Sequence, residues 1–137
     1  VAIVGDDAVY PSVVVSGGSV SISESVSTAY IGLPYTTEIV TLPPEVPQKD
    51  GASFGKKKSW NRIILNLYQT LGITINSKQL ILRSGGDPMD SAPPEFTGQH
   101  DVTNLGWKES DSSLTIKQEQ PLGMTLISLT GELNVSD

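Results

Sequence analysis

Cysteine is absent from the sequence, which excludes disulfides and thiolate metal sites within the chain. No apolar run approaches the ~18 residues that a membrane span requires, and nothing resembles a signal peptide. Alanine is infrequent, so good helix formers are few. Acidic residues outnumber basic ones, and the formal charge of −6 at pH 7 disfavours stable nucleic-acid binding. We therefore expect no membrane span, little helix and no nucleic-acid partner.

Valine, isoleucine, threonine, serine, glycine and proline are common instead, as is typical of strands joined by turns. Stretches with strand character cover residues 1–4, 8–16, 19–23, 26–32, 36–42, 78–83, 102–108, 114–118, 124–129 and 132–135. The sequence therefore predicts an all-β fold, an antiparallel β-sandwich or barrel-like domain with long Pro/Gly-rich loops. We expect residues 1–137 to form a single domain. Because the chain begins with Val1 rather than methionine, we expect it to be a fragment or a processed piece.

Turns and loops can be placed within this pattern. Gly17-Gly18 is expected to close a hairpin between two of the strands. Gly131 is expected to mark a bulge before the last strand. Residues 43–47 contain three prolines and are expected to be extended and polyproline-like. Residues 84–101 are expected to form a long loop, and loops of this length are usually functional or held at an interface.

Residues 55–75 are the longest apolar-rich segment without proline, and two interpretations are open for them. As a helix, the segment would carry an amphipathic stripe. As a strand, it would place Ile63, Leu65 and Leu67 on one face and Trp60 on the other. The three lysines at its start oppose a helix dipole, and its end is β-branched. Since strands also dominate the rest of the chain, a long strand is favoured.

No residue pattern predicts catalysis. His100 precedes Asp101, but adjacency in sequence does not give triad geometry, and no serine elbow or cysteine accompanies the pair. We expect His100 to be a solvent-facing loop residue. Asp87, Asp90 and Glu95 crowd the same loop, where carboxylates could bind Ca²⁺, yet the spacing fits no EF-hand. We therefore predict no enzyme activity, no metal and no cofactor.

The sequence does offer residues for contact with a partner. A basic cluster lies at the start of residues 55–75, and it is interpreted either as a solvated turn or as a contact for an acidic partner. Aromatic residues at this low frequency are more often core or interface anchors than a sugar-binding platform. The predicted partner-contact residues are Lys56, Lys57, Lys58, Tyr35, Trp60, Trp107 and Phe96.

Several strings, in this order, carry a family resemblance. They are Val9-Tyr10-Pro11, residues 31–37 (Ile-Gly-Leu-Pro-Tyr-Thr-Thr), residues 55–58 leading into 62–68, Phe96-Thr97-Gly98, residues 114–122 and residues 132–135. Together they resemble the C-terminal region of tail proteins from short-tailed bacteriophages and related prophages, of the tail tubular protein B or nozzle kind. The resemblance spans almost the whole chain, and the Gly-Leu-Pro-Tyr-Thr-Thr segment is its most distinctive part.

This resemblance implies a structural virion protein of the phage tail, made in the bacterial host cytoplasm. Such proteins form a ring around the channel through which DNA leaves. The implied partners are other tail subunits: the adaptor, a fibre or spike, and further copies in the ring. It also implies that residues 62–71 are β, that the chain is a C-terminal fragment of a larger tail protein, and that there are no catalytic residues. The alternative is a carbohydrate-binding or adhesin-like module for recognition of the host surface, whose signature would be coplanar exposed aromatic rings such as Trp60 and Trp107.

Overall fold

The computed structural model describes residues 1–49, 51–108 and 112–136, and these residues form strands and loops without a helix. The strands are β1 (Ala2–Gly5), β2 (Ala8–Tyr10), β3 (Ala29–Gly32), β4 (Thr37–Val40), β5 (Pro47–Gln48), β6 (Gly51–Ala52), β7 (Lys58–Thr70), β8 (Ile73–Ile75), β9 (Lys78–Gln79), β10 (Phe96–Thr103), β11 (Trp107–Lys108), β12 (Thr115–Gln118) and β13 (Leu126–Val135). The all-β prediction is confirmed. Nothing helical in these ranges is long and apolar enough to cross a membrane.

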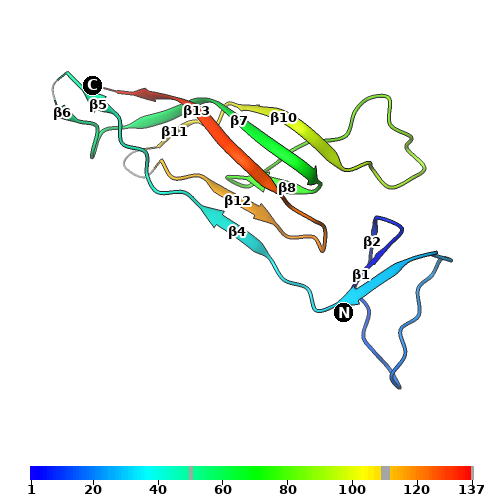
Figure 1. The fold of residues 1–137 in the computed structure, drawn as a ribbon. Helices are drawn as coiled ribbons and strands as arrows, with labels where there is room; N and C mark the ends of the chain where they lie inside the picture. The colour runs from blue at the N-terminus through cyan, green and yellow to red at the C-terminus, as the bar shows by residue number, and fades with distance from the viewer. Residues whose placement is uncertain (50, 109–111, 137) are drawn as a thin grey trace.

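Two four-stranded antiparallel sheets pack face to face and form the main body (Figure 1). In the first, β7 is flanked by β10 and β11 on one side and by β13 on the other. The second has the order β4-β12-β8-β9. Fully buried side chains from both sheets form one apolar cluster, which includes Ile63, Leu65 and Leu67 from the first sheet and Ile73, Ile75 and Ile116 from the second. This packing gives the predicted β-sandwich-like arrangement.

The long strand β7 spans the first sheet and confirms the strand interpretation of the central segment. It is interrupted twice. Opposite β13, Arg62 pairs with Glu132 and Trp60 with Leu133, so Asn61 is an extra residue. Near the other end of β7, two of its residues lie opposite a single residue of β10. Gln69, one of the two, has a positive φ of 43°. Because each bulge reverses the alternation of side chains, Trp60 lies on the same inner face as the buried core residues. Its predicted position on the opposite face was wrong.

A small three-stranded sheet, β2-β1-β3, lies beyond one end of the sandwich (Figure 1). Its strand β1 is buried, with Ile3 only 1% exposed. Asp6 and Asp7 form the β1–β2 turn with positive φ values of 46° and 65°. The carboxylate of Asp6 accepts hydrogen bonds from the backbone N–H groups of Ser27 and Thr28, both at 2.9 Å. This contact ties the chain entering β3 to the turn.

Four local predictions need correction. The Gly17-Gly18 turn is present, with φ values of 59° and 78°, but only one bridge, between Ser16 and Ser19, forms beside it. The predicted loop at residues 84–101 ends earlier, because β10 begins at Phe96. The strand predicted at residues 78–83 is limited to Lys78–Gln79. Gly131 itself pairs with Ile63; the bulge predicted near it lies between Glu132 and Leu133, and its extra residue is Asn61 on β7.

Candidate interaction surface

Strand β4 is an edge strand whose outer side has no strand partner in the described part of the chain. Its pairing with β12 places Ile39 opposite Ile116, and Thr41 N donates to Leu114 O at 2.9 Å. In an antiparallel pair, alternate residues direct their N–H and C=O groups toward the partner. Since Thr41 and Ile39 face β12, the backbone groups of Val40 on this strand face outward. The edge is therefore open to a further strand.

Large apolar side chains lie along this edge instead of the charges that usually protect one. Val40 is 58% exposed, and Leu42, two residues further on, is 86% exposed. The one charged residue of β4, Glu38, forms an ion pair of 3.3 Å with Lys117 on β12. Exposed edge strands normally carry lysine, proline or a bulge that deters pairing. None of these lies within Thr37–Val40.

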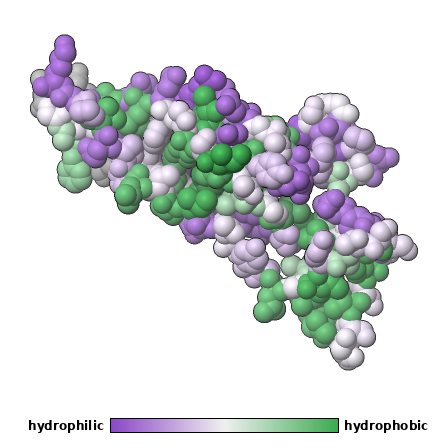
Figure 2. Space-filling model, viewed as in Figure 1, coloured by the Kyte–Doolittle hydropathy of each residue, from purple (hydrophilic) through white to green (hydrophobic). Residues whose placement is uncertain are grey.

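The exposed apolar row continues from β4 back into β3, which is an edge strand of the small sheet. The connection between the two strands carries Leu33, which is 84% exposed, and Tyr35, which is 76% exposed. We call the whole row the 30–42 edge; its large exposed apolar residues are Tyr30, Ile31, Leu33, Tyr35, Ile39, Val40 and Leu42. Figure 1 shows β3 and β4 following one another along one side of the molecule, and Figure 2 shows hydrophobic residues along the lower margin where β4 runs.

A groove of about 470 Å³ opens beside this row, between the small sheet and the turn that precedes β13. Val4, Tyr30, Leu33 and Tyr35 line one part of it, and Leu122 lines another. Contiguous apolar surface of this kind commonly marks contact with another protein. Tyr35 is thus the predicted partner-contact residue that falls within the 30–42 edge.

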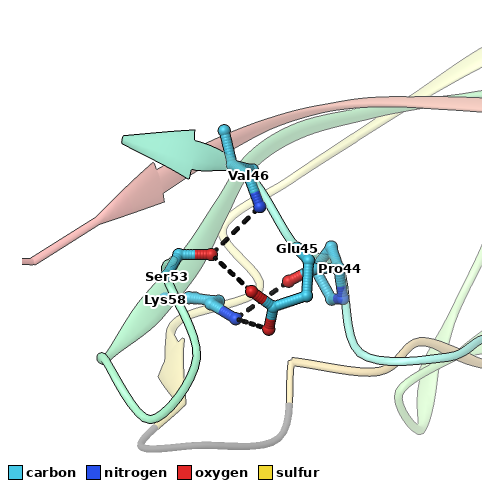
Figure 3. A network of polar contacts seen from close by, with 5 residues as sticks. All are labelled: Pro44, Glu45, Val46, Ser53 and Lys58. Carbon is cyan, nitrogen blue, oxygen red and sulfur yellow. Dashed lines mark hydrogen bonds and ion pairs between the residues drawn. The ribbon is translucent and has the colours of Figure 1, made fainter. Parts of the chain in front are cut away.

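Lys58, in contrast, serves an internal network and is only 1% exposed (Figure 3). Its ammonium group donates to the carbonyl oxygen of Pro44 at 2.8 Å and to Glu45 Oε1 at 3.1 Å. Ser53 is also buried; its hydroxyl donates to Glu45 Oε2 and accepts from Val46 N–H. Lys58 therefore holds the proline-rich segment against the start of β7 and is not accessible to a partner.

The other two lysines of the predicted cluster lie in the loop before β7. Lys56 is half-buried and donates to Gln48 Oε1 at 2.8 Å. Lys57 is exposed, and its backbone carbonyl accepts the N–H of Ser136. Their loop joins β6 to β7, and β5 and β6 lie at the end of the sandwich opposite the small sheet (Figure 1). The two lysines are not part of the 30–42 edge.

The predicted aromatic contacts do not form a common platform. Trp60 packs against the core on the inner face and donates from Nε1 to Ser112 O at 2.7 Å. Trp107 is 59% exposed and pairs with Ser59, the residue next to Trp60, so it lies on the outer face. By this alternation the two indoles face different sides of the sheet, although both residues border one cavity of about 300 Å³. Phe96 also packs on the core and contacts His100 edge-to-face, with ring centroids 5.9 Å apart.

His100 and Asp101 are consecutive residues of β10 and face opposite sides of the sheet. His100 is half-buried in a strand rather than solvent-facing in a loop, which corrects the prediction. Asp101 accepts hydrogen bonds from Nε and Nη2 of Arg62, and this interaction raises the pKa of the Arg62 guanidinium. Nearby Glu132 on β13 acts on that pKa in the same direction. The Arg62–Asp101 pair is therefore an exposed cross-strand contact. His100 and Asp101 do not form a catalytic dyad, because they face opposite sides of the sheet.

The acidic residues of the predicted long loop do not gather at one place either. Asp87 accepts the backbone N–H of Ser84 at 2.6 Å, while Asp101 is on a strand. Within residues 1–49, 51–108 and 112–136, no three histidine or acidic side chains are grouped so that they could hold a metal ion. Leu33, Val40 and Leu42 were not predicted as contact residues. The sequence signal that could have indicated an exposed apolar surface there is the charge-poor run at residues 25–44. Glu38 is its one charged residue.

Comparison of the chain with known proteins identifies no relative: no family model and no curated protein matches it.

Proposed function

We propose that this chain is a structural domain of a bacteriophage tail, which makes subunit or fibre contacts around the channel through which DNA leaves the particle. The proposal rests on the resemblance of its sequence strings to tail proteins of the nozzle kind. It is supported by an architecture in which sheets and anchored loops dominate and an extended apolar edge is left exposed. Structural components of a particle are held together by contacts of this kind.

One observation carries the proposal. The most distinctive string of the resemblance, at residues 32–37, contributes nothing large to the core, because Leu33 and Tyr35 are among the most exposed apolar residues described. Packing within this chain therefore does not explain why leucine and tyrosine occur there. A surface that contacts another protein does, since aromatic and large apolar residues are the usual anchors of an interface.

The test is the protein composition of purified particles. Virions of the phage, or of the induced prophage, whose genome encodes this chain are purified by density gradient and analysed by mass spectrometry. We expect peptides of the chain in intact particles and their enrichment in isolated tails. Absence of the chain from infectious particles would refute the proposal.

A second measurement connects the function to the proposed surface. Phages are produced with Tyr35→Ser or with Ile81→Ser; Ile81 is 80% exposed and lies outside the 30–42 edge, so it serves as the control. We expect fewer complete tails with Tyr35→Ser and normal particles with Ile81→Ser. Equal particle yields from the two variants would contradict the role of this surface.

A further inference from the structure

Residues 11–28, between β2 and β3, form an arm that is built from strand-forming sequence but is almost unpaired. Val13 exchanges two backbone hydrogen bonds with Val1, at 2.7 and 3.1 Å. Beyond this pair, the backbone-to-backbone bonds found for the described arm residues are those between Ser16 and Ser19 around the glycine turn, and one from Asp6 N–H to Thr28 O. The N–H groups of Ser27 and Thr28 donate to the Asp6 carboxylate. Val14 is 86% exposed and Val15 is 47% exposed. Valine-rich sequence favours β-strands, yet most of this segment pairs with no strand.

The arm and the β4 edge match in charge. Residues 11–23 of the arm contain no acidic or basic side chain and Glu24 is the one charged residue within 11–28, although the chain as a whole carries a formal charge of −6. On β4, the charge of Glu38 is balanced by Lys117. Two acidic copies repel one another over most of their surfaces, but this repulsion is weakest where both partners are neutral. Both segments also expose large apolar side chains.

The other edges of the two four-stranded sheets are poorer partners for an added strand. β10 pairs irregularly with β7 next to Gly98, and it carries the exposed pair of Asp101 with Arg62. β13 carries the charged Glu132 and two register shifts. β9 has only two residues, one of which is Lys78. Charges and bulges of this kind deter strand addition, so among the described edges of the two four-stranded sheets Thr37–Val40 is the best acceptor.

We infer that the arm of one copy adds as a strand to the β4 edge of a second copy. Within one molecule the arm projects away from its own β4, which lies on the side of the sandwich (Figure 1). The contact is therefore between copies and joins two different surfaces. Contacts between unlike surfaces continue from copy to copy and close into a ring when the rotation allows it. The role of this contact within a phage particle rests on the proposed function. The contact itself can be tested on the isolated chain.

Cysteine cross-linking tests the pairing directly, because the chain has no cysteine of its own. Val14→Cys and Val40→Cys are made separately, and both positions are exposed enough for the change to leave the fold intact. The two proteins are treated with a short bis-maleimide alone and as a mixture. We expect a covalent dimer in the mixture and none in either protein alone. A dimer from Val40→Cys alone would indicate edge-to-edge pairing, and a mixture without a dimer would remove the contact; both results overturn the inference.

Charge variants give the energetic test. Sedimentation of the unmodified chain is expected to show concentration-dependent association. Val14→Glu and Val40→Lys are each expected to raise the dissociation constant at least ~10-fold, since each puts an unpaired charge into the contact. The double variant is expected to recover most of this loss because the two new charges then meet. Ile81→Lys, outside both segments, is the control and should associate as the unmodified chain does.

These outcomes separate the inference from the proposed function. A chain that stays monomeric at all concentrations, or a double variant no better than either single one, would overturn the arm-to-edge contact. If such a chain were nevertheless present in virions, the proposed function would stand without this contact. If the chain associated as described but was absent from particles, the contact would stand and the tail function would fail.

Discussion

The indole of Trp60 packs directly on Gly131 of the neighbouring strand, where there is no room for a side chain. A Cβ atom placed on Gly131 would lie 2.5 Å from Trp60 Cζ3 and 2.8 Å from Cε3. The ring is held in this position, because its Nε1 donates to Ser112 O and its body packs on the core. Glycine at this place in β13 is therefore a packing requirement between β13 and β7.

Gly131→Ala is expected to destabilise the protein by about 1–3 kcal/mol, the usual cost of forcing an extra carbon into a packed site. Urea denaturation monitored by tryptophan fluorescence measures the change. Gly85→Ala is the matched control, since no atom lies within 4 Å of a Cβ there and its φ is not positive. That control should change stability by less than ~0.5 kcal/mol. Equal stability of the two variants would contradict the packing account.

The type of most elements could be predicted from the sequence because local chemistry determines it. Turns such as Asn76-Ser77, with φ values of 47° and 66°, connect strands where the turn residues predict them. The strand at β7 follows from its composition. The bulges at Asn61 and Gln69 have no comparable local signature, since they arise from the register of β13 and β10 against β7. For this reason the grouping of Ile63, Leu65 and Leu67 on one face of β7 was correct, whereas the placement of Trp60 on the opposite face was wrong.

The candidate surface was harder to predict than the fold. Alternation along β4 gives the two faces of the strand, but whether that strand lies at an edge depends on the order β4-β12-β8-β9, which long-range pairing sets. The exposure of Val40 could therefore not be deduced locally. Burial of Lys58 has the same origin, because its partners Pro44 and Glu45 lie more than ten residues away in sequence. A lysine beside other lysines looks solvent-exposed until those partners are known.

Lys58→Met is expected to destabilise the protein by about 1–3 kcal/mol, although methionine has a similar shape and is apolar. The substitution leaves the carbonyl of Pro44 and the carboxylate of Glu45 without the ammonium group that they share. Thermal and urea unfolding measure the loss. Faster hydrogen exchange at the Val46 amide, which donates to Ser53 in the same network, is the local readout.

The control for this prediction is Lys49→Met, at an exposed lysine of the turn between β5 and β6, which should change stability by less than ~0.5 kcal/mol. Combining Lys58→Met with Glu45→Gln should cost less than the sum of the two single changes, because they remove the same interaction. Full additivity would show that Lys58 and Glu45 act independently and would remove the network as the reason for the burial.

Gly72→Ala is expected to destabilise the connection between the two sheets. Gly72 joins β7 to β8 with a φ of 68°, and a Cβ there would lie 2.9 Å from Gln120 Oε1. Strained backbone of this kind costs about 1–3 kcal/mol for a residue with a side chain. Gly55→Ala is the matched control, because Gly55 has a φ of 78° and nothing within 4 Å. Gly72→Ala should unfold at lower urea than Gly55→Ala; the reverse order would show that the contact with Gln120 is unimportant.

Acid is expected to loosen the small sheet through Asp6. Hydrogen bonds from the N–H groups of Ser27 and Thr28 lower the pKa of this carboxyl below the ordinary value of 3.8. Because the folded-state pKa is the lower one, the stabilisation is fully present above pH ~4 and is lost as the pH falls through the folded-state value. Asp6→Asn should therefore lower the protection factors of the Ser27 and Thr28 amides at neutral pH and abolish their further decrease in acid. Asp7→Asn, at the next residue of the same turn, should leave both the protection factors and their pH dependence unchanged; identical behaviour of the two variants in NMR-detected exchange would contradict the role of Asp6.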